Sequence, residues 1–161
     1  MNLTEIQDKL IGDWKGNNLL RTSWLTPPEH LSSSNLSVAQ VANGKFLTFT
    51  YTWSHEDIAH EGLLVLAYDN EQNVATAAWV DSWHMSNKIM PYRGTIDQLG
   101  VIDLLGSYEA PPGPDWGWRI IIAPASGNDL QITMFNISPE GVEDLAVKAD
   151  YKPAHASGIT I

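Results

Sequence analysis

The chain contains no cysteine among its 161 residues. This absence excludes disulfide bonds, thiolate metal sites and cysteine nucleophiles. Basic residues are also scarce: nine Lys and Arg stand against 19 Asp and Glu, which gives a formal net charge of −10. Such an acidic chain repels polyanions, so we expect no binding to nucleic acid or to an anionic membrane surface.

Long apolar runs are missing as well. No segment approaches the roughly 18 apolar residues that a membrane-spanning helix requires. The first residues, MNLTEIQDKLIGDW, lack the basic and apolar regions of a signal peptide. We therefore expect a cytoplasmic protein. The length suits one domain with a single core, over residues 1–153, followed by a loose tail over residues 154–161.

Segments with the alternation of a β-strand are abundant. The clearest is KFLTFTYTWS, Lys45 to Ser54, which follows the turn pair Asn43-Gly44. One face of this segment carries Leu47, Phe49, Tyr51 and Trp53, and the other carries threonines. Strict period-two alternation of aromatic, aliphatic and β-branched residues after Asn-Gly predicts a β-hairpin.

Similar segments recur along the whole chain. We expect strands over residues 14–25, 36–42, 45–54, 58–68, 74–83, 90–96, 99–108, 116–123, 130–137 and 145–151. A short helix is expected over Thr4–Leu10, and loops at Ser32–Asn35 and Ala110–Asp115. Short turns without helices between them require antiparallel pairing. The predicted fold is all-β: a single antiparallel up-and-down β-barrel of about ten strands with one short N-terminal helix.

Several short motifs occur in order. Gly12-Asp13-Trp14-Lys15-Gly16 lies where the helix meets the first strand. Later come Glu61-Gly62, Tyr68-Asp69, Trp79-x-Asp81-Ser82, Gly94, Arg119, Ser138-Pro139-Glu140-Gly141 and Tyr151. The opening motif resembles the G-x-W of lipocalin-like barrels and the G-x-W-x-G of nitrobindin-like ones. The whole succession resembles an uncharacterised bacterial family of lipocalin-like, calycin-type β-barrels of unknown function.

The resemblance implies a barrel with an internal cavity, without an assigned activity. It implies that Trp14 closes the narrow end of the barrel and packs on a cationic side chain, for which Arg119 is the candidate. Nitrobindin-like barrels hold haem through a histidine on the last strand, but DLAVKADY, residues 144–151, contains none. We therefore expect no haem or other cofactor, and the histidine spacings predict no metal site.

Seven Trp residues are many for this length, and such clusters suit either a barrel core or a binding cavity. The candidates for cavity walls are Tyr51, Trp53, Trp79 and Tyr108. The candidates for polar anchors are His60, Asp81, Arg93 and Arg119. An inward Asp81 needs a partner, and Arg93 on the next strand is the nearest by topology. Such a pair could orient a polar group of a ligand, or it could be a structural pair inside the barrel.

Each anchor also has a structural interpretation. A buried Arg119 requires an anion, but it could instead cover the barrel end or extend to solvent. His60 shares a face with Gly62, where the missing side chain leaves room for a ligand, yet it could be a hydrogen-bonded rim residue. Asp81, Ser82 and His84 form no catalytic triad, because neighbours on one strand point to opposite faces.

Three functions remain open. The first is non-covalent binding of a small, partly apolar molecule in the cavity, which rests on the expected fold and the aromatic residues. The second is an isomerase or hydrolase that uses His60 as a general base. The third is an interaction module, such as a homodimer formed through the outer face of Leu63, Val65 and Ala67, without a ligand.

Overall fold

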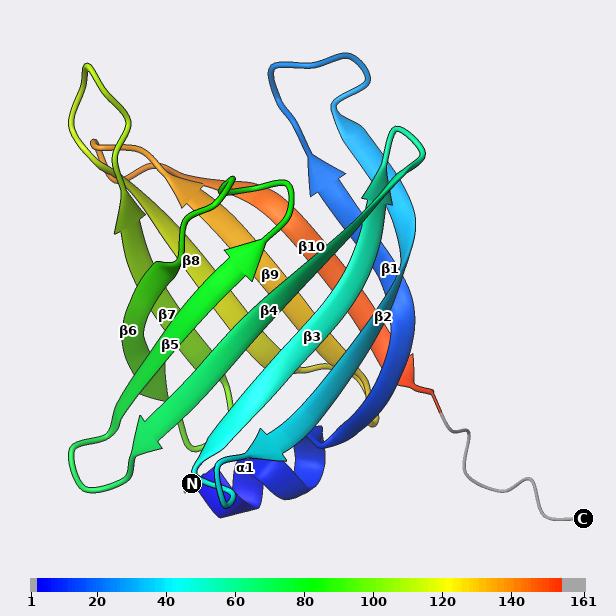
Figure 1. Ribbon diagram of the computed structural model, residues 1–161, viewed down its shortest axis with the longest axis vertical. Helices are drawn as coiled ribbons and strands as arrows, with labels where there is room; N and C mark the ends of the chain where they lie inside the picture. Colours follow the sequence, from blue (N-terminus) through cyan, green and yellow to red (C-terminus); the bar gives the residue numbers. More distant parts are fainter. Residues whose placement is uncertain (1–2, 155–161) are drawn as a thin grey trace, which may run out of the picture.

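The chain forms a closed, ten-stranded antiparallel barrel in the computed structural model, which describes residues 3–154. Each strand pairs with the next along the chain, and β1 pairs with β10 to close the sheet (Figure 1). The elements are α1 (Leu3–Leu10), β1 (Gly12–Arg21), β2 (Glu29–Val41), β3 (Phe46–His55), β4 (Ile58–Asp69), β5 (Val74–Asp81), β6 (Met90–Ile96), β7 (Ile102–Tyr108), β8 (Trp116–Pro124), β9 (Leu130–Ile137) and β10 (Glu143–Pro153). The predicted fold is confirmed.

The hairpin turns follow the predicted chemistry. Asn43 and Gly44 have φ of 59° and 74°, and the Lys45 amide donates to the Ala42 carbonyl at 3.3 Å. Ala42 also has a positive φ, 52°, so three successive residues of the Ala42–Lys45 connection adopt the left-handed backbone that Asn and Gly accept most readily in tight hairpin turns. The Leu47 face of β3 points into the barrel, since Leu47, Phe49 and Trp53 are at most 3% exposed.

Several predicted boundaries are wrong. The first strand, expected to extend to residue 25, ends at Arg21, and the strand expected from residue 99 begins at Ile102. The serine-rich segment expected as a loop belongs to β2, which begins at Glu29 and pairs with β1 through Asn18↔Ser32 and Lys15↔Asn35. Small polar residues are accepted there because inward Ser34 is satisfied inside the barrel, 2.7 Å from the Tyr151 hydroxyl. The strand expected to extend to residue 83 ends instead at Asp81.

One end of the barrel is closed by α1, which lies at the bottom of Figure 1. Leu3, Ile6 and Leu10 are buried, so the apolar face of the helix packs into the barrel. Trp14 lies at the same end, 7% exposed, and its Nε1 donates to the Leu10 carbonyl at 2.9 Å. Gln7 Nε2 donates to the Gly44 carbonyl at 2.9 Å and ties the helix to the β2–β3 turn.

The C-terminal segment expected as a tail begins at a fixed point. The Ala154 amide donates to the Asp13 carbonyl at 2.9 Å, beside the start of β1. Residues 155–161 of that expected tail lie outside the described residues. No helix within residues 3–154 has the length and apolar character needed to cross a membrane.

We expect Trp14→Phe to lower the free energy of unfolding by about 1–2 kcal/mol, because it removes a buried hydrogen bond and part of a packed ring. The matched control is Trp24→Phe, since Trp24 is 70% exposed. That control should change the stability by less than about 0.5 kcal/mol. Urea denaturation followed by circular dichroism measures both. Equal effects of the two substitutions would contradict a closing role for Trp14.

Candidate functional site

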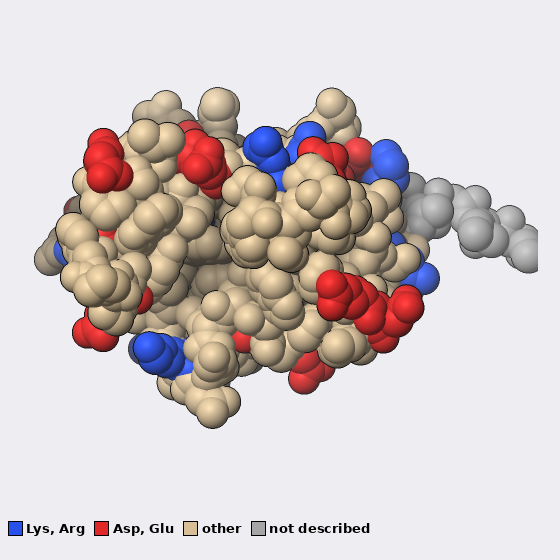
Figure 2. Space-filling model, turned by 90° about the horizontal axis from the view of Figure 1, so that it is seen from above, with Lys and Arg blue, Asp and Glu red and all other residues tan. Residues whose placement is uncertain are grey.

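The candidate site lies at the end of the barrel opposite α1. Figure 2 looks onto this end and shows a recess between the surrounding loops, with acidic side chains spread around it. The ends of β3, β5 and β8 bring Trp53, Trp79 and Trp118 into the barrel interior, where each is at most 9% exposed. The segment after β5 adds Trp83 and His84 to this cluster.

Asp81, the last residue of β5, organises the cluster. Its carboxylate is 4% exposed, and Oδ2 accepts hydrogen bonds from the Tyr51 hydroxyl at 2.6 Å and from Trp53 Nε1 at 3.2 Å. Its Oδ1 accepts from the backbone amides of Trp83 at 2.8 Å and His84 at 3.2 Å. A buried carboxylate is tolerated when donors surround it in this way, and these four bonds occupy its acceptor positions.

The two backbone bonds to Asp81 also end the strand. A carboxylate that accepts from amides two and three residues later forms a local turn, which competes with the sheet ladder. Trp83 and His84 therefore turn inward together, with ring centroids 4.8 Å apart. Period-two alternation, expected to continue to residue 83, therefore ends at Asp81, where the strand ends.

Tyr51 joins Asp81 to a second indole. Its hydroxyl oxygen accepts from Trp79 Nε1 at 2.8 Å. Burial, followed by the Asp81 charge, raises the pKa of Tyr51 well above its usual value, so the phenol stays protonated. The Tyr51 ring lies over Gly62, where an added Cβ would stand 2.1 Å from the hydroxyl oxygen. The Tyr51 ring therefore fills the space beside Gly62 in which we expected a ligand.

His84 is half-buried and packs against four aromatic rings. Its ring centroid lies 5.5 Å from both Trp53 and Trp79, 5.4 Å from Trp118 and 4.8 Å from Trp83. Burial lowers the pKa of His84 to about 4, although the Asp81 carboxylate favours the protonated form. His84 is therefore a neutral imidazole at pH 7.

His60 lies at the rim on β4. Its Nδ1 is 2.9 Å from Ser82 Oγ, and its ring packs on Trp53 with centroids 4.9 Å apart. Ser82 Oγ also accepts from the Glu61 amide at 3.1 Å. Sequence reasoning missed the His60–Ser82 contact, because it depends on the register that brings the end of β5 beside β4.

One indole N–H in this aromatic cluster lacks a hydrogen-bond partner in the described part of the chain. Trp118 is 9% exposed, stacks on Trp79 with centroids 5.8 Å apart, and its Nε1 has no hydrogen-bond acceptor among residues 3–154. Asn18 is also buried, 5% exposed, in the interior beside β1's other inward residues. Sequence reasoning named neither residue, although alternation from Trp14 places Asn18 on the inner face of β1.

Tyr108 lies on the inner face of β7, half-buried. Its hydroxyl donates to Asn136 Oδ1 at 2.5 Å. Burial raises the pKa of Tyr108, while the hydrogen bond to Asn136 lowers it by a smaller amount. Tyr108 is therefore a neutral, hydrogen-bonded residue of the interior.

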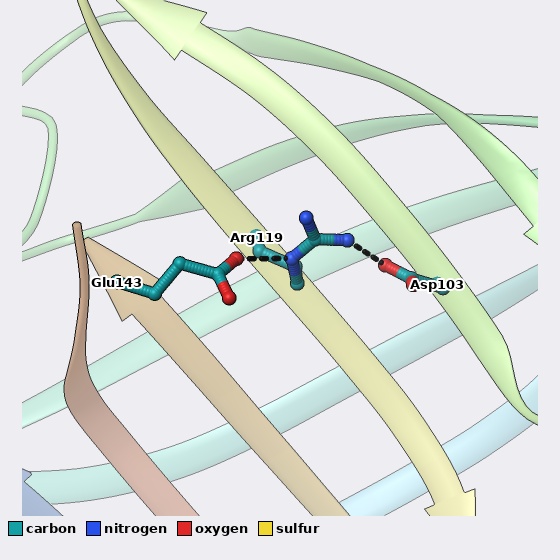
Figure 3. A network of polar contacts seen from close by, with 3 residues as sticks. All are labelled: Asp103, Arg119 and Glu143. Atoms are coloured by element: carbon teal, nitrogen blue, oxygen red, sulfur yellow. Dashed lines mark hydrogen bonds and ion pairs between the residues drawn. The ribbon is translucent and has the colours of Figure 1, made fainter. Parts of the chain in front are cut away.

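The two arginines predicted as interior anchors lie on the outside. Arg93 is exposed, because it alternates with inward Tyr92 on β6, so the predicted Asp81–Arg93 pair is not formed. Arg119 Nε and Nη1 bind Glu143 at 2.7 Å and Asp103 at 2.8 Å on the outer surface (Figure 3). These carboxylates raise the pKa of Arg119. Arg119 is thus neither a partner of Trp14 nor an interior anchor.

No group of three or more His, Asp or Glu side chains in residues 3–154 has the arrangement of a metal site. The four histidines described include His30 and His55, whose rings meet edge to face at 4.6 Å. His55 is 8% exposed, and its Nδ1 has no partner among those residues.

The closed ten-stranded antiparallel sheet, the helical plug and the aromatic interior define a lipocalin-like β-barrel protein. The chain belongs to the family described as protein of unknown function (DUF1579), whose profile matches residues 5–153. The predicted resemblance to a lipocalin-like family of unknown function is confirmed. A search of curated proteins found no match.

Solved structures with similar folds include two barrels. Rv2717c from M. tuberculosis has a TM-score of 0.66 at 14% identity, over 96% of this chain and 99% of that one. The S-type phycobiliprotein lyase CPES from Guillardia theta has a TM-score of 0.65 at 13% identity, over 98% of this chain and 95% of that one. At these identities the similarity establishes the fold alone.

We expect Asp81→Asn to lower the free energy of unfolding by about 3 kcal/mol, because four donors converge where an amide offers one acceptor oxygen and two further donors. The matched control is Asp103→Asn on the outer surface, where the carboxylate is 41% exposed. That control should cost less than about 1 kcal/mol. Urea titration of both variants measures the difference, and equal losses would show that the Asp81 network contributes no more than a surface ion pair.

His84 should make stability depend on pH. The unfolded imidazole has a pKa near 6.5, and the folded one about 4, so the unfolded state is protonated first as the pH falls. This contribution to stability is fully present above pH ~6.5 and is lost as the pH falls from there towards ~4. Between pH 7 and pH 4.5 the wild type should lose on the order of 2 kcal/mol more than His84→Phe. Parallel pH profiles from urea titrations would contradict this.

Proposed function

We propose that this protein binds a small, partly apolar molecule non-covalently inside the open end of the barrel. The observation that carries the proposal is the unpaired indole N–H of Trp118, buried among aromatic rings. A buried donor without an acceptor costs about 1–3 kcal/mol, so a molecule that supplies the acceptor gains binding energy there.

The aromatic candidates would contribute apolar surface. The polar atoms of Tyr51, Trp53 and Trp79 are already bonded to one another or to Asp81. Their ring faces, together with the half-buried Tyr108, are what remains to contact a ligand. Asp81 acts through its neighbours, because it holds Trp83 and His84 in place, and His60 lies at the rim.

The enzyme alternative has one observation in its favour, the 2.9 Å contact between His60 Nδ1 and Ser82 Oγ. Within residues 3–154, however, no carboxylate bonds to His60 to orient it, and Ser82 Oγ already accepts from the Glu61 amide. A fold shared with a phycobiliprotein lyase at 13% identity transfers no activity. Ligand binding is therefore the better-supported function.

Native mass spectrometry of the protein as purified, compared with the same sample denatured, tests the proposal. We expect the native ion to carry the additional mass of a small molecule, and Trp118→Phe to retain less of it than the control Trp24→Phe. The phenyl ring keeps the stacking on Trp79 but cannot donate a hydrogen bond.

Two results together would contradict binding. The first is a native ion with the mass of the bare polypeptide, as monomer or dimer. The second is a Trp118 indole N–H resonance that does not move when the protein is mixed with a small-molecule extract. A dimer without a ligand would instead favour the interaction hypothesis for the outer face of Leu63, Val65 and Ala67.

A further inference from the structure

We propose that the ligand is an uncharged, largely apolar molecule that accepts a hydrogen bond from Trp118 Nε1 through a carbonyl oxygen, an ether oxygen or a ring nitrogen. The proposal rests on the proposed function and narrows it to one chemical class. Two observations support it: the basic side chains lie on the outer surface of the barrel, and the only polar atom of the Trp118 side chain is its N–H donor.

Within residues 3–154, no Lys or Arg side chain in the interior could pair with an anionic ligand. All nine Lys and Arg lie within residues 3–154, and seven of them are exposed. The other two are half-buried on the outer face: Arg119 bonds to Asp103 and Glu143, and Lys148 alternates with inward Val147. A ligand carboxylate would therefore be buried without a counter-charge, near the carboxylate of Asp81.

A cationic ligand is disfavoured by the same interior. The Asp81 oxygens already accept four hydrogen bonds, so they offer no free position for an ammonium donor. The pKa of His84 indicates the cost of a positive charge here. Burial beside four indoles lowers this pKa to about 4, because the attraction of the Asp81 carboxylate is smaller than the cost of desolvating the protonated imidazole. Both signs of charge are thus unfavourable in this part of the barrel.

The polar contact requires an acceptor. An indole N–H only donates, so the ligand atom that meets Trp118 must carry a lone pair. The surroundings of that contact are largely apolar, because Trp79 stacks on Trp118 and the inward neighbour along β8, Ile120, is 1% exposed. The neutral imidazole of His84, 5.4 Å from the Trp118 ring, is the polar neighbour. An apolar body with one acceptor satisfies both conditions.

Three naphthalenes of similar size test separately whether the ligand needs an acceptor and whether it must be uncharged. The ketone 2-acetylnaphthalene has a neutral acceptor, 2-ethylnaphthalene has no acceptor, and 2-naphthoate carries a negative charge. We expect the wild type to bind the ketone about three- to tenfold more tightly than the ethyl compound, as one neutral hydrogen bond allows. The naphthoate should bind at least about 100-fold more weakly than the ketone, because its charge is buried unpaired. Quenching of tryptophan fluorescence measures the affinities.

Trp118→Phe should abolish the preference for the ketone over the ethyl compound, while Trp24→Phe should keep it. In the wild type, the indole N–H resonance that is absent from the Trp118→Phe spectrum should shift with the ketone and not with the ethyl compound.

The possible failures are distinguishable. Naphthoate binding as tight as that of the ketone would overturn the proposed ligand class and leave binding itself intact. Equal affinities of the wild type for the ketone and the ethyl compound would overturn the hydrogen bond to Trp118. If none of the three compounds bound at its solubility limit, this proposal would be overturned and the proposed function would lose its apolar site as well.

Discussion

One buried carboxylate, that of Asp81, determines the arrangement of the open end of the barrel. A charge at 4% exposure is costly unless donors surround it, and this one collects two side-chain donors and two backbone amides. The same four bonds end β5, hold the phenol of Tyr51 over Gly62, and turn Trp83 and His84 inward. The aromatic cluster and the low pKa of His84 both follow from that arrangement.

Closure of the sheet determines whether each of the other charged side chains lies inside or outside the barrel. A closed barrel has no edge strand, and its residues alternate between the interior and the surface, with one irregularity in β10 between Leu145 and Val147. The basic side chains all fall on the outer surface, where Arg119 bridges β7 and β10 through Asp103 and Glu143. The interior is therefore aromatic, aliphatic and almost free of charge. This contrast explains why the strongly acidic composition says little about what the barrel holds.

Much of the fold was predictable because local rules and tertiary structure agree. Period-two alternation and turn pairs such as Asn43-Gly44 identified ten strands, with most boundaries near those observed. The Ser32–Asn35 segment was misassigned, because serines between turn-like residues resemble a loop until a neighbouring strand supplies the ladder. Period-two alternation also predicts that Arg119 points outward, because its neighbours Trp118 and Ile120 point inward. The apolar residues around it in the sequence suggested burial instead.

The amino-acid sequence by itself determined the architecture: alternation and turn chemistry act over a few residues, so strands, hairpins and barrel closure follow from local pattern. The tertiary structure alone decided the site. Tyr51, Trp53 and Asp81 meet only because β3, β4 and β5 lie side by side in one register, and a shift of one residue would separate them. Likewise, the missing acceptor of Trp118 is a property of its surroundings, which no spacing in the sequence specifies.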